Sequence, residues 1–166
     1  MPQPNDQKII MSKKSAGILL YRFKNKNLEF LLVHPGGPFW KNKDEGAWSI
    51  PKGEFDDDEK PLEAAIRELK EETGIVLKGD FIELTPVKQK SGKLVYAFAK
   101  EHDLDPSQIK SNEFEMEWPP KSGKKKMFPE IDKAEWFDKK IAKDKIITAQ
   151  LSLVEELDSK LKQNKK

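Results

Sequence analysis

The chain has 166 residues, of which 31 are basic and 29 are acidic, so its formal net charge is +2. A chain of this length predicts one domain that is large enough to form its own hydrophobic core. The absence of cysteine excludes disulfide bonds, thiol catalysis and zinc–thiolate sites, and the near balance of charge gives no general case for nucleic-acid binding.

Residues 1–12 are polar and predict a flexible lead segment without the apolar region of a signal peptide. No apolar run approaches the roughly 18 residues that a membrane-spanning helix needs. These features favour a cytoplasmic protein that does not enter a membrane. The sequence leaves its oligomeric state open.

Two apolar stretches, residues 15–23 and 28–34, predict strands that are joined by a turn of polar residues. The second stretch is continuously apolar, which is typical of a strand buried on both faces. We therefore expect a hairpin at the centre of the sheet. His34 lies at the end of the second strand, where we interpret it as a structural residue.

Residues 35–48 are rich in turn-forming residues, which predicts a loop, but the loop also contains Phe39, Trp40 and Trp48. These aromatic residues either cover the edge of the core or offer a stacking surface for a nucleobase. Pro51-Lys52-Gly53 then predicts a tight turn that leads into an acidic loop.

Residues 61–73 predict a short amphipathic helix, and Gly74 predicts its end. The apolar positions fall on one face, whereas Glu68, Glu71 and Glu72 lie together on another. Neighbouring like charges repel, and the helix dipole disfavours anions in the last turn. The acidic face is either simply solvated or compensated by a hard divalent cation, which prefers carboxylate oxygens.

The spacing of the fixed residues in this region resembles the complete signature of the Nudix hydrolases. Gly53 is followed after five residues by Glu59, and after seven more by the run Arg67-Glu68-Leu69-Lys70-Glu71-Glu72-Thr73-Gly74-Ile75. Every fixed position of the signature agrees, which makes this motif far more specific than a lone glycine pattern.

The resemblance implies an α+β fold, in which an α/β/α sandwich surrounds a central mixed sheet. It implies that residues 13–162 form a single Nudix hydrolase domain, followed by a frayed tail at 163–166. It also implies a cofactor, Mg²⁺ or Mn²⁺, and a set of site residues. The metal ligands would be Glu68, Glu71, Glu72 and the backbone carbonyl of Lys52. The catalytic residues would be the same three glutamates together with Arg67, which orients Glu59. Gly53, Glu59 and Gly74 would have structural roles.

The resemblance also suggests a substrate. The Pro-Lys-Gly form is similar to members that act on dinucleoside polyphosphates or diphosphoinositol polyphosphates, and Lys52 could reach a phosphate as a point charge. Tyr96 lies where some dinucleoside polyphosphate hydrolases hold the base, although it could equally belong to the core. We expect hydrolysis of a nucleoside polyphosphate such as diadenosine tetraphosphate, with a (d)NTP pyrophosphohydrolase or a non-catalytic nucleotide-binding module as alternatives. An RNA 5′ end is disfavoured by the low net charge.

Residues 76–88 predict one or two strands, and 93–100 predict a returning strand after a turn at Ser91-Gly92. Residues 112–118 alternate strictly between acidic and apolar side chains, which is typical of a strand. Its acidic face is either solvated or provides a further metal ligand or base. The candidates are Glu117 and Glu115, with Glu130 third.

Residues 121–126 predict a basic loop, whose lysines Lys124, Lys125 and Lys126 either keep a loop tip solvated or bind substrate phosphates. Residues 128–137 predict one further strand. Asp138 is expected to cap a short helix that ends at Lys143, and Thr148 is expected to cap a helix over 149–161 that packs on the sheet.

Overall fold

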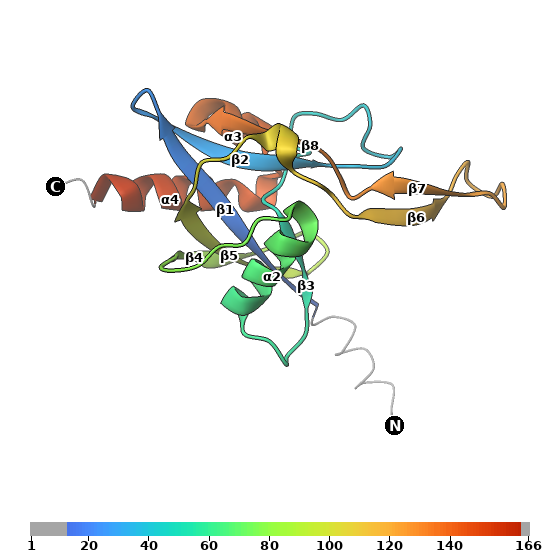
Figure 1. Cartoon of the computed structure of the whole chain (residues 1–166), viewed down its shortest axis with the longest axis horizontal. Helices are drawn as coiled ribbons and strands as arrows, with labels where there is room; N and C mark the ends of the chain where they lie inside the picture. The colour runs from blue at the N-terminus through green and yellow to red at the C-terminus, as the bar shows by residue number, and fades with distance from the viewer. Residues whose placement is uncertain (1–12, 164–166) are drawn as a thin grey trace.

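The computed structural model describes residues 13–163, so the predicted lead segment at 1–12 and the tail residues 164–166 lie outside it (Figure 1). The strands are β1 (Lys14–Lys24), β2 (Asn27–Pro35), β3 (Lys52–Phe55), β4 (Ile82–Lys88), β5 (Leu94–Glu101), β6 (Glu113–Glu117), β7 (Lys125–Pro129) and β8 (Ile131–Asp138). The helices are α2 (Pro61–Thr73), α3 (Lys139–Lys145) and α4 (Leu151–Gln163), with 3₁₀ turns η1 (Pro106–Gln108) and η2 (Thr148–Gln150). No helix in the described part is long and apolar enough to cross a membrane.

The main sheet is mixed and has the order β4-β5-β1-β2-β8, while β3 pairs with the first residues of β1. Strands β1 and β5 run parallel, and the other pairs run antiparallel. The predicted hairpin of β1 and β2 is confirmed at the centre of the sheet. Phe30, Leu31 and Leu32 in succession are fully buried, because helices cover both faces.

Alternating side chains of β1 belong to two separate cores, one on each face of the sheet. Ala16, Ile18 and Leu20 belong to the core under α2, whereas Leu19 and Tyr21 belong to the core that includes residues of α3 and α4. The predicted α/β/α sandwich with a central mixed sheet is therefore confirmed, and it places α2 alone on the face that carries the acidic residues.

The predicted bounds of the acidic helix are confirmed at Pro61–Thr73. Gly74 ends it in the left-handed conformation at φ 82°, and its N–H donates to the carbonyl of Lys70. Asp138 caps α3 as predicted, because its carboxylate accepts from the N–H of Ile141. The prediction for Thr148 was wrong: it lies inside η2, makes no cap, and α4 begins only at Leu151.

The single strand predicted over 128–137 is divided between two sheets. The register of β2 with β8 shifts between His34 and Pro35, so residues before Ile131 leave the main sheet and pair with β6 instead. The resulting two-stranded unit, residues 113–129, is called the arm below and projects from the body (Figure 1). The strand prediction for 76–88 holds only from Ile82 onward.

Candidate metal and phosphate site

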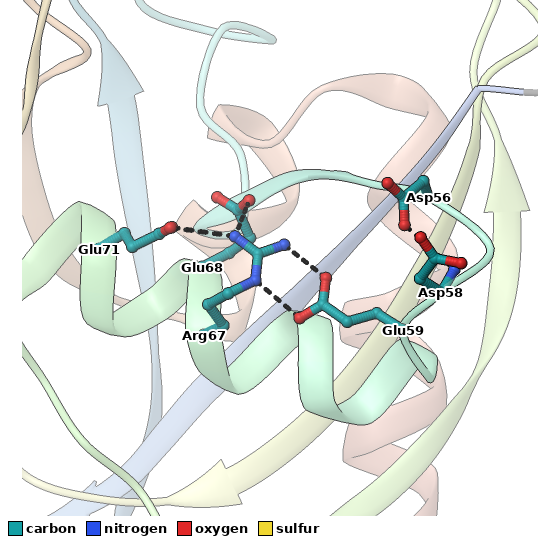
Figure 2. Close-up of polar contacts among 6 residues, drawn as sticks. All are labelled: Asp56, Asp58, Glu59, Arg67, Glu68 and Glu71. Atoms are coloured by element: carbon teal, nitrogen blue, oxygen red, sulfur yellow. Dashed lines mark hydrogen bonds and ion pairs between the residues drawn. The ribbon is translucent and has the colours of Figure 1, made fainter.

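The guanidinium group of Arg67 is held among three carboxylates at the acidic helix (Figure 2). Its Nε and Nη2 donate to the two oxygens of Glu59, both at 2.7 Å, and its Nη1 donates to Glu68 and Glu71 at 2.9 Å. The bidentate bond lowers the pKa of Glu59, and the same bond raises the pKa of Arg67. Sequence reasoning predicted the contact with Glu59 but not those with Glu68 and Glu71.

Gly53 is needed because the carboxylate of Glu68 lies directly against its Cα. A Cβ at position 53 would lie 1.9 Å from Oε2 of Glu68 and 2.1 Å from its Cδ. The tight turn predicted at Pro51-Lys52-Gly53 was wrong, since β3 already begins at Lys52 and pairs with Gly17. The glycine therefore provides space for a side chain rather than an unusual backbone conformation.

Gly53→Ala is expected to move the Glu68 carboxylate, because the clash involves the free end of a flexible side chain. The cost in folding free energy should stay near 1 kcal/mol, whereas any hydrolytic activity that depends on the position of Glu68 should fall at least tenfold, as when a group that orients a metal ligand is lost. Thermal melting and initial rates measure the two effects. A large fall in melting temperature with the rate preserved would contradict this assignment.

Glu72 is the carboxylate most strongly perturbed by its surroundings. Burial raises its pKa to about 8, with further contributions from the negative charges of Glu68 and Glu130. Burial also raises the pKa of Glu68, against the opposing effect of Arg67. Acidic groups from α2 and from the junction of β7 and β8 therefore meet at one place, which is the situation that a bound cation would relieve.

A cavity of about 160 Å³ lies at this meeting point, lined by Glu72, Glu130 and Lys52 together with apolar residues of β2 and its neighbours. This volume corresponds to about five water molecules at about 30 Å³ each. It suits a hydrated ion or a phosphate group. A whole nucleotide would have to extend outward from it.

Lys52 brings a buried cation to the same cavity. Burial and the charge of Lys93 lower the pKa of its ammonium group, whereas Glu72 and Glu54 act in the opposite direction. Lys93 is itself bonded to Glu54 at 2.7 Å. Within residues 13–163 the Lys52 ammonium has no hydrogen-bond or ion-pair partner, so its charge is available to an anion.

Of the three carboxylates predicted outside the helix, the structure brings only Glu130 to the cluster. Glu117 accepts the N–H groups of Lys121 and Gly123 in the turn of the arm, and Glu115 faces Lys125 at 3.6 Å. The geometry therefore favours Glu130, the third candidate, over Glu117 and Glu115. Glu130 was ranked last because only the division of β7 from β8 places it beside α2.

The predicted base-stacking residues lie in different surroundings. Tyr96 packs edge-to-face on Phe55, with ring centroids 5.9 Å apart, and contributes to the core under α2. Trp40 is 39% exposed in the loop after β2, with the ammonium of Lys43 5.1 Å from its ring centroid. Trp48 is buried and covers the core.

The structural interpretation of His34 is confirmed. The side chain is buried, and its ring nitrogens lie 2.8 Å from the Asp132 carboxylate and 2.6 Å from the carbonyl of Lys43. Both contacts join the end of β2 to neighbouring segments. The imidazole therefore holds the loop in place and makes no contact with the carboxylates of α2.

A larger cavity, of about 510 Å³, lies elsewhere, beside Arg22 and Trp136. The Arg22 guanidinium in its lining already binds Glu29 and Asp103 and stacks over Trp136, 4.3 Å from the ring centroid. We therefore assign the candidate site by its chemistry and not by its volume.

The residues around Glu72 fit a hard divalent cation. Their donors are carboxylate and carbonyl oxygens, which suit Mg²⁺ or Mn²⁺ better than Zn²⁺. In the part of the chain that the structure describes, no three acidic or histidine side chains converge on one point, because Glu68 and Glu71 turn toward Arg67. Mg²⁺ commonly binds through one or two carboxylates and keeps several waters, so the arrangement is compatible with such an ion.

Comparisons with known proteins identify the family to which the chain is similar. A family model of the NUDIX domain matches residues 11–157. The asymmetrical bis(5′-nucleosyl)-tetraphosphatase of Rattus norvegicus is 33% identical over 108 residues, covering 57% of this chain and 69% of that protein. The RNA pyrophosphohydrolase of Bartonella tribocorum is 68% identical, but over only 28 residues.

Solved structures share the fold. A Caenorhabditis elegans Ap4A hydrolase in a binary complex superposes with a TM-score of 0.62 at 21% identity, covering 90% of this chain and 98% of that one. The NUDIX domain of Shewanella oneidensis NrtR, complexed with ADP ribose, gives a TM-score of 0.61 at 18% identity, with 90% and 88% coverage. At these identities the superpositions bear on the fold alone.

Proposed function

The chain belongs to the NUDIX domain family and is a Nudix hydrolase, and from this premise we propose that it hydrolyses a phosphoanhydride bond in a nucleoside polyphosphate with the help of a divalent cation. The observation that carries the proposal is the position of Glu72, which is partly buried at the cavity with Glu68 and Glu130 as acidic neighbours. Burial, followed by the charges of these two neighbours, raises the pKa of Glu72 to about 8. A partly buried carboxylate with two acidic neighbours is the expected condition of a site built for a cation.

Each residue of the site has a role in this proposal. Glu72, Glu68 and Glu130 would hold the cation, with the Lys52 carbonyl as a further ligand, while Arg67 holds Glu71 at the edge of the site. When bound, the cation would neutralise phosphate oxygens and make a water molecule more acidic. Glu59 orients Arg67, which in turn fixes the position of Glu68.

Lys52 would bind a phosphate oxygen of the substrate, since its ammonium shares the cavity with Glu72 and has no protein partner in the described residues. Glu68 or Glu130 would take the proton of the attacking water. The raised pKa of Glu68 suits that role, because a general base works best when its pKa approaches the working pH.

Our first choice of substrate is a dinucleoside polyphosphate such as diadenosine tetraphosphate. Three observations support it: the Pro-Lys-Gly sequence before the helix, the similarity to asymmetrical bis(5′-nucleosyl)-tetraphosphatases from Rattus norvegicus and Mus musculus, and the small cavity, which accepts phosphate and leaves the nucleosides outside.

The test is a product assay on purified protein with diadenosine tetraphosphate, ATP, ADP-ribose and triphosphorylated RNA, each with Mg²⁺ and with Mn²⁺. We expect the highest kcat/KM for the dinucleoside substrate and no turnover in EDTA. The Glu72→Gln variant, purified in parallel, controls for contaminating phosphatases. A higher kcat/KM for any of the other three compounds would refute the substrate assignment, and turnover in EDTA would refute the role of the cation.

A further inference from the structure

The arm carries different chemistry on its two faces. Directly opposed residues of an antiparallel pair share a face, and the register pairs Phe114 with Phe128 and Met116 with Lys126. The backbone bond from Trp118 to Lys124, at 2.9 Å, continues this register. One face therefore presents aromatic and apolar side chains together with Lys124 and Lys126, and it is called the aromatic–lysine face below.

The loop after β2 lies along the aromatic–lysine face. Gly37 lies against Phe114, since a Cβ at position 37 would be 3.1 Å from its ring. Phe39 contacts Trp118 edge-to-face, with centroids 5.7 Å apart, yet remains 57% exposed. An aromatic platform, consisting of Phe39 and Trp118, is thus held open to solvent near the end of the arm.

The aromatic–lysine face starts at the candidate site. Glu130, which lines the cavity, follows directly after β7, and its carbonyl accepts the N–H of Gly36 at 2.9 Å. At a strand rise of about 3.3 Å per residue, Lys126 lies about 13 Å and Lys124 about 20 Å from Glu130 along the arm. Outward from the cavity the face therefore presents Phe114 with Phe128, then Met116 with Lys126, and then Trp118 with Lys124.

We propose that the aromatic–lysine face binds the half of a two-headed substrate that lies beyond the scissile bond, with Lys126 and Lys124 on its phosphates and the platform of Phe39 and Trp118 under its base. This inference rests on the proposed function and assigns a specificity element to it. Stacking on an aromatic ring tolerates any base, so the arm selects for a second nucleoside and not for its identity.

The surroundings of the face favour a small nucleotide over a nucleic acid. The opposite face carries Glu113, Glu115 and Glu117, and Lys125 there faces Glu115. The lysines available to phosphate are therefore confined to one side of a short arm. A nucleic acid needs many phosphate contacts for useful affinity at physiological salt, whereas one nucleoside with its adjoining phosphates needs few.

The test compares diadenosine tetraphosphate with adenosine tetraphosphate, which has the same number of phosphates and lacks the second nucleoside. Phe39→Leu should lower the ratio of the two kcat/KM values about tenfold, because stacking of one base is worth about 1–3 kcal/mol. Lys124→Gln/Lys126→Gln should raise KM for diadenosine tetraphosphate and weaken its dependence on salt between 50 and 200 mM.

The matched control is Lys24→Gln/Lys26→Gln, which removes two exposed lysines with the same spacing at the end of the β1–β2 hairpin. It should keep the native ratio and salt dependence. An unchanged ratio of kcat/KM values in Phe39→Leu, including an equal loss of kcat/KM on both substrates, would overturn the inference. A change in the elution volume of the variant would also overturn it, because the arm would then be a structural or subunit contact. If native protein did not cleave diadenosine tetraphosphate, the proposed substrate itself would be refuted, which is a separate outcome from failure of the arm.

Discussion

Glu72→Gln is expected to lose nearly all hydrolytic activity while melting at a higher temperature than the native protein at pH 8 without metal. The activity loss should exceed the roughly 10- to 100-fold that removal of an outer-shell partner of a metal ligand costs, because Glu72 is itself assigned as a ligand. The gain in stability follows from the raised pKa of this carboxyl group.

The sign follows from the linkage between protonation and folding. A carboxyl whose pKa is raised on folding, here from 4.5 to about 8, stabilises the fold below its unfolded pKa and loses that contribution as pH rises toward 8. Glutamine cannot ionise, so the variant avoids the loss. At about 1.4 kcal/mol per pKa unit and about 2–4 °C per kcal/mol for a domain of this size, the difference should reach several degrees.

Melting curves of the metal-free proteins at pH 5, 6.5 and 8 measure this effect. Addition of Mg²⁺ should raise the melting temperature of the native protein most at pH 8 and should change that of Glu72→Gln little. Glu63→Gln is the matched control, because Glu63 is an exposed carboxylate in the first turn of the same helix. An active Glu72→Gln variant, or one that melts lower at pH 8, would remove Glu72 from the proposed site.

Arg67→Ala is expected to lower both stability and activity, because one guanidinium group satisfies Glu59, Glu68 and Glu71 together. Bonds to charged groups contribute about 1.5–3 kcal/mol each when buried, but Arg67 is 38% exposed, so solvent screening reduces the total to about 2 kcal/mol. Activity should fall more than tenfold as Glu68 loses its fixed orientation.

Arg67→Lys distinguishes charge from geometry. Lysine keeps the positive charge but lacks the planar fork that binds Glu59 through two bonds, so it should recover part of the stability and little of the activity. Lys70→Ala, which removes an exposed cation from the same helix, is the control and should resemble the native protein in both measurements. Loss of stability in Arg67→Ala with full activity would show that Arg67 only supports the fold.

The acidic helix could be predicted from the sequence because its determinants are local. Apolar spacing, Pro61 at its start and Gly74 at its end set the bounds that the structure shows. Glu68, Glu71 and Glu72 follow from the same 3.6-residue period. The incorrect prediction that Thr148 caps the last helix also has a local cause. Thr148 lies in the 3₁₀ turn η2, which precedes α4, so its side chain does not cap that helix.

The position of Glu130 could not be predicted, because it depends on which strands pair. Residues 128–137 have one continuous strand-like pattern, yet β2 has room for β8 only from Ile131 onward, so β7 turns away to pair with β6. Glu130 lies at the point of division. The contact between the Gly53 Cα and the Glu68 carboxylate could not be predicted for the same reason, because the two residues belong to different elements.

The sequence by itself determined the family resemblance and the acidic helix, since these depend on residue types at short spacing. Only the tertiary structure decided which acid joins Glu68 and Glu72, which partners Arg67 takes, and which face of the arm follows on from the cavity. Those outcomes depend on contacts between segments far apart in the chain, where strand register and the competition of charges for partners select one arrangement among several that the local pattern permits.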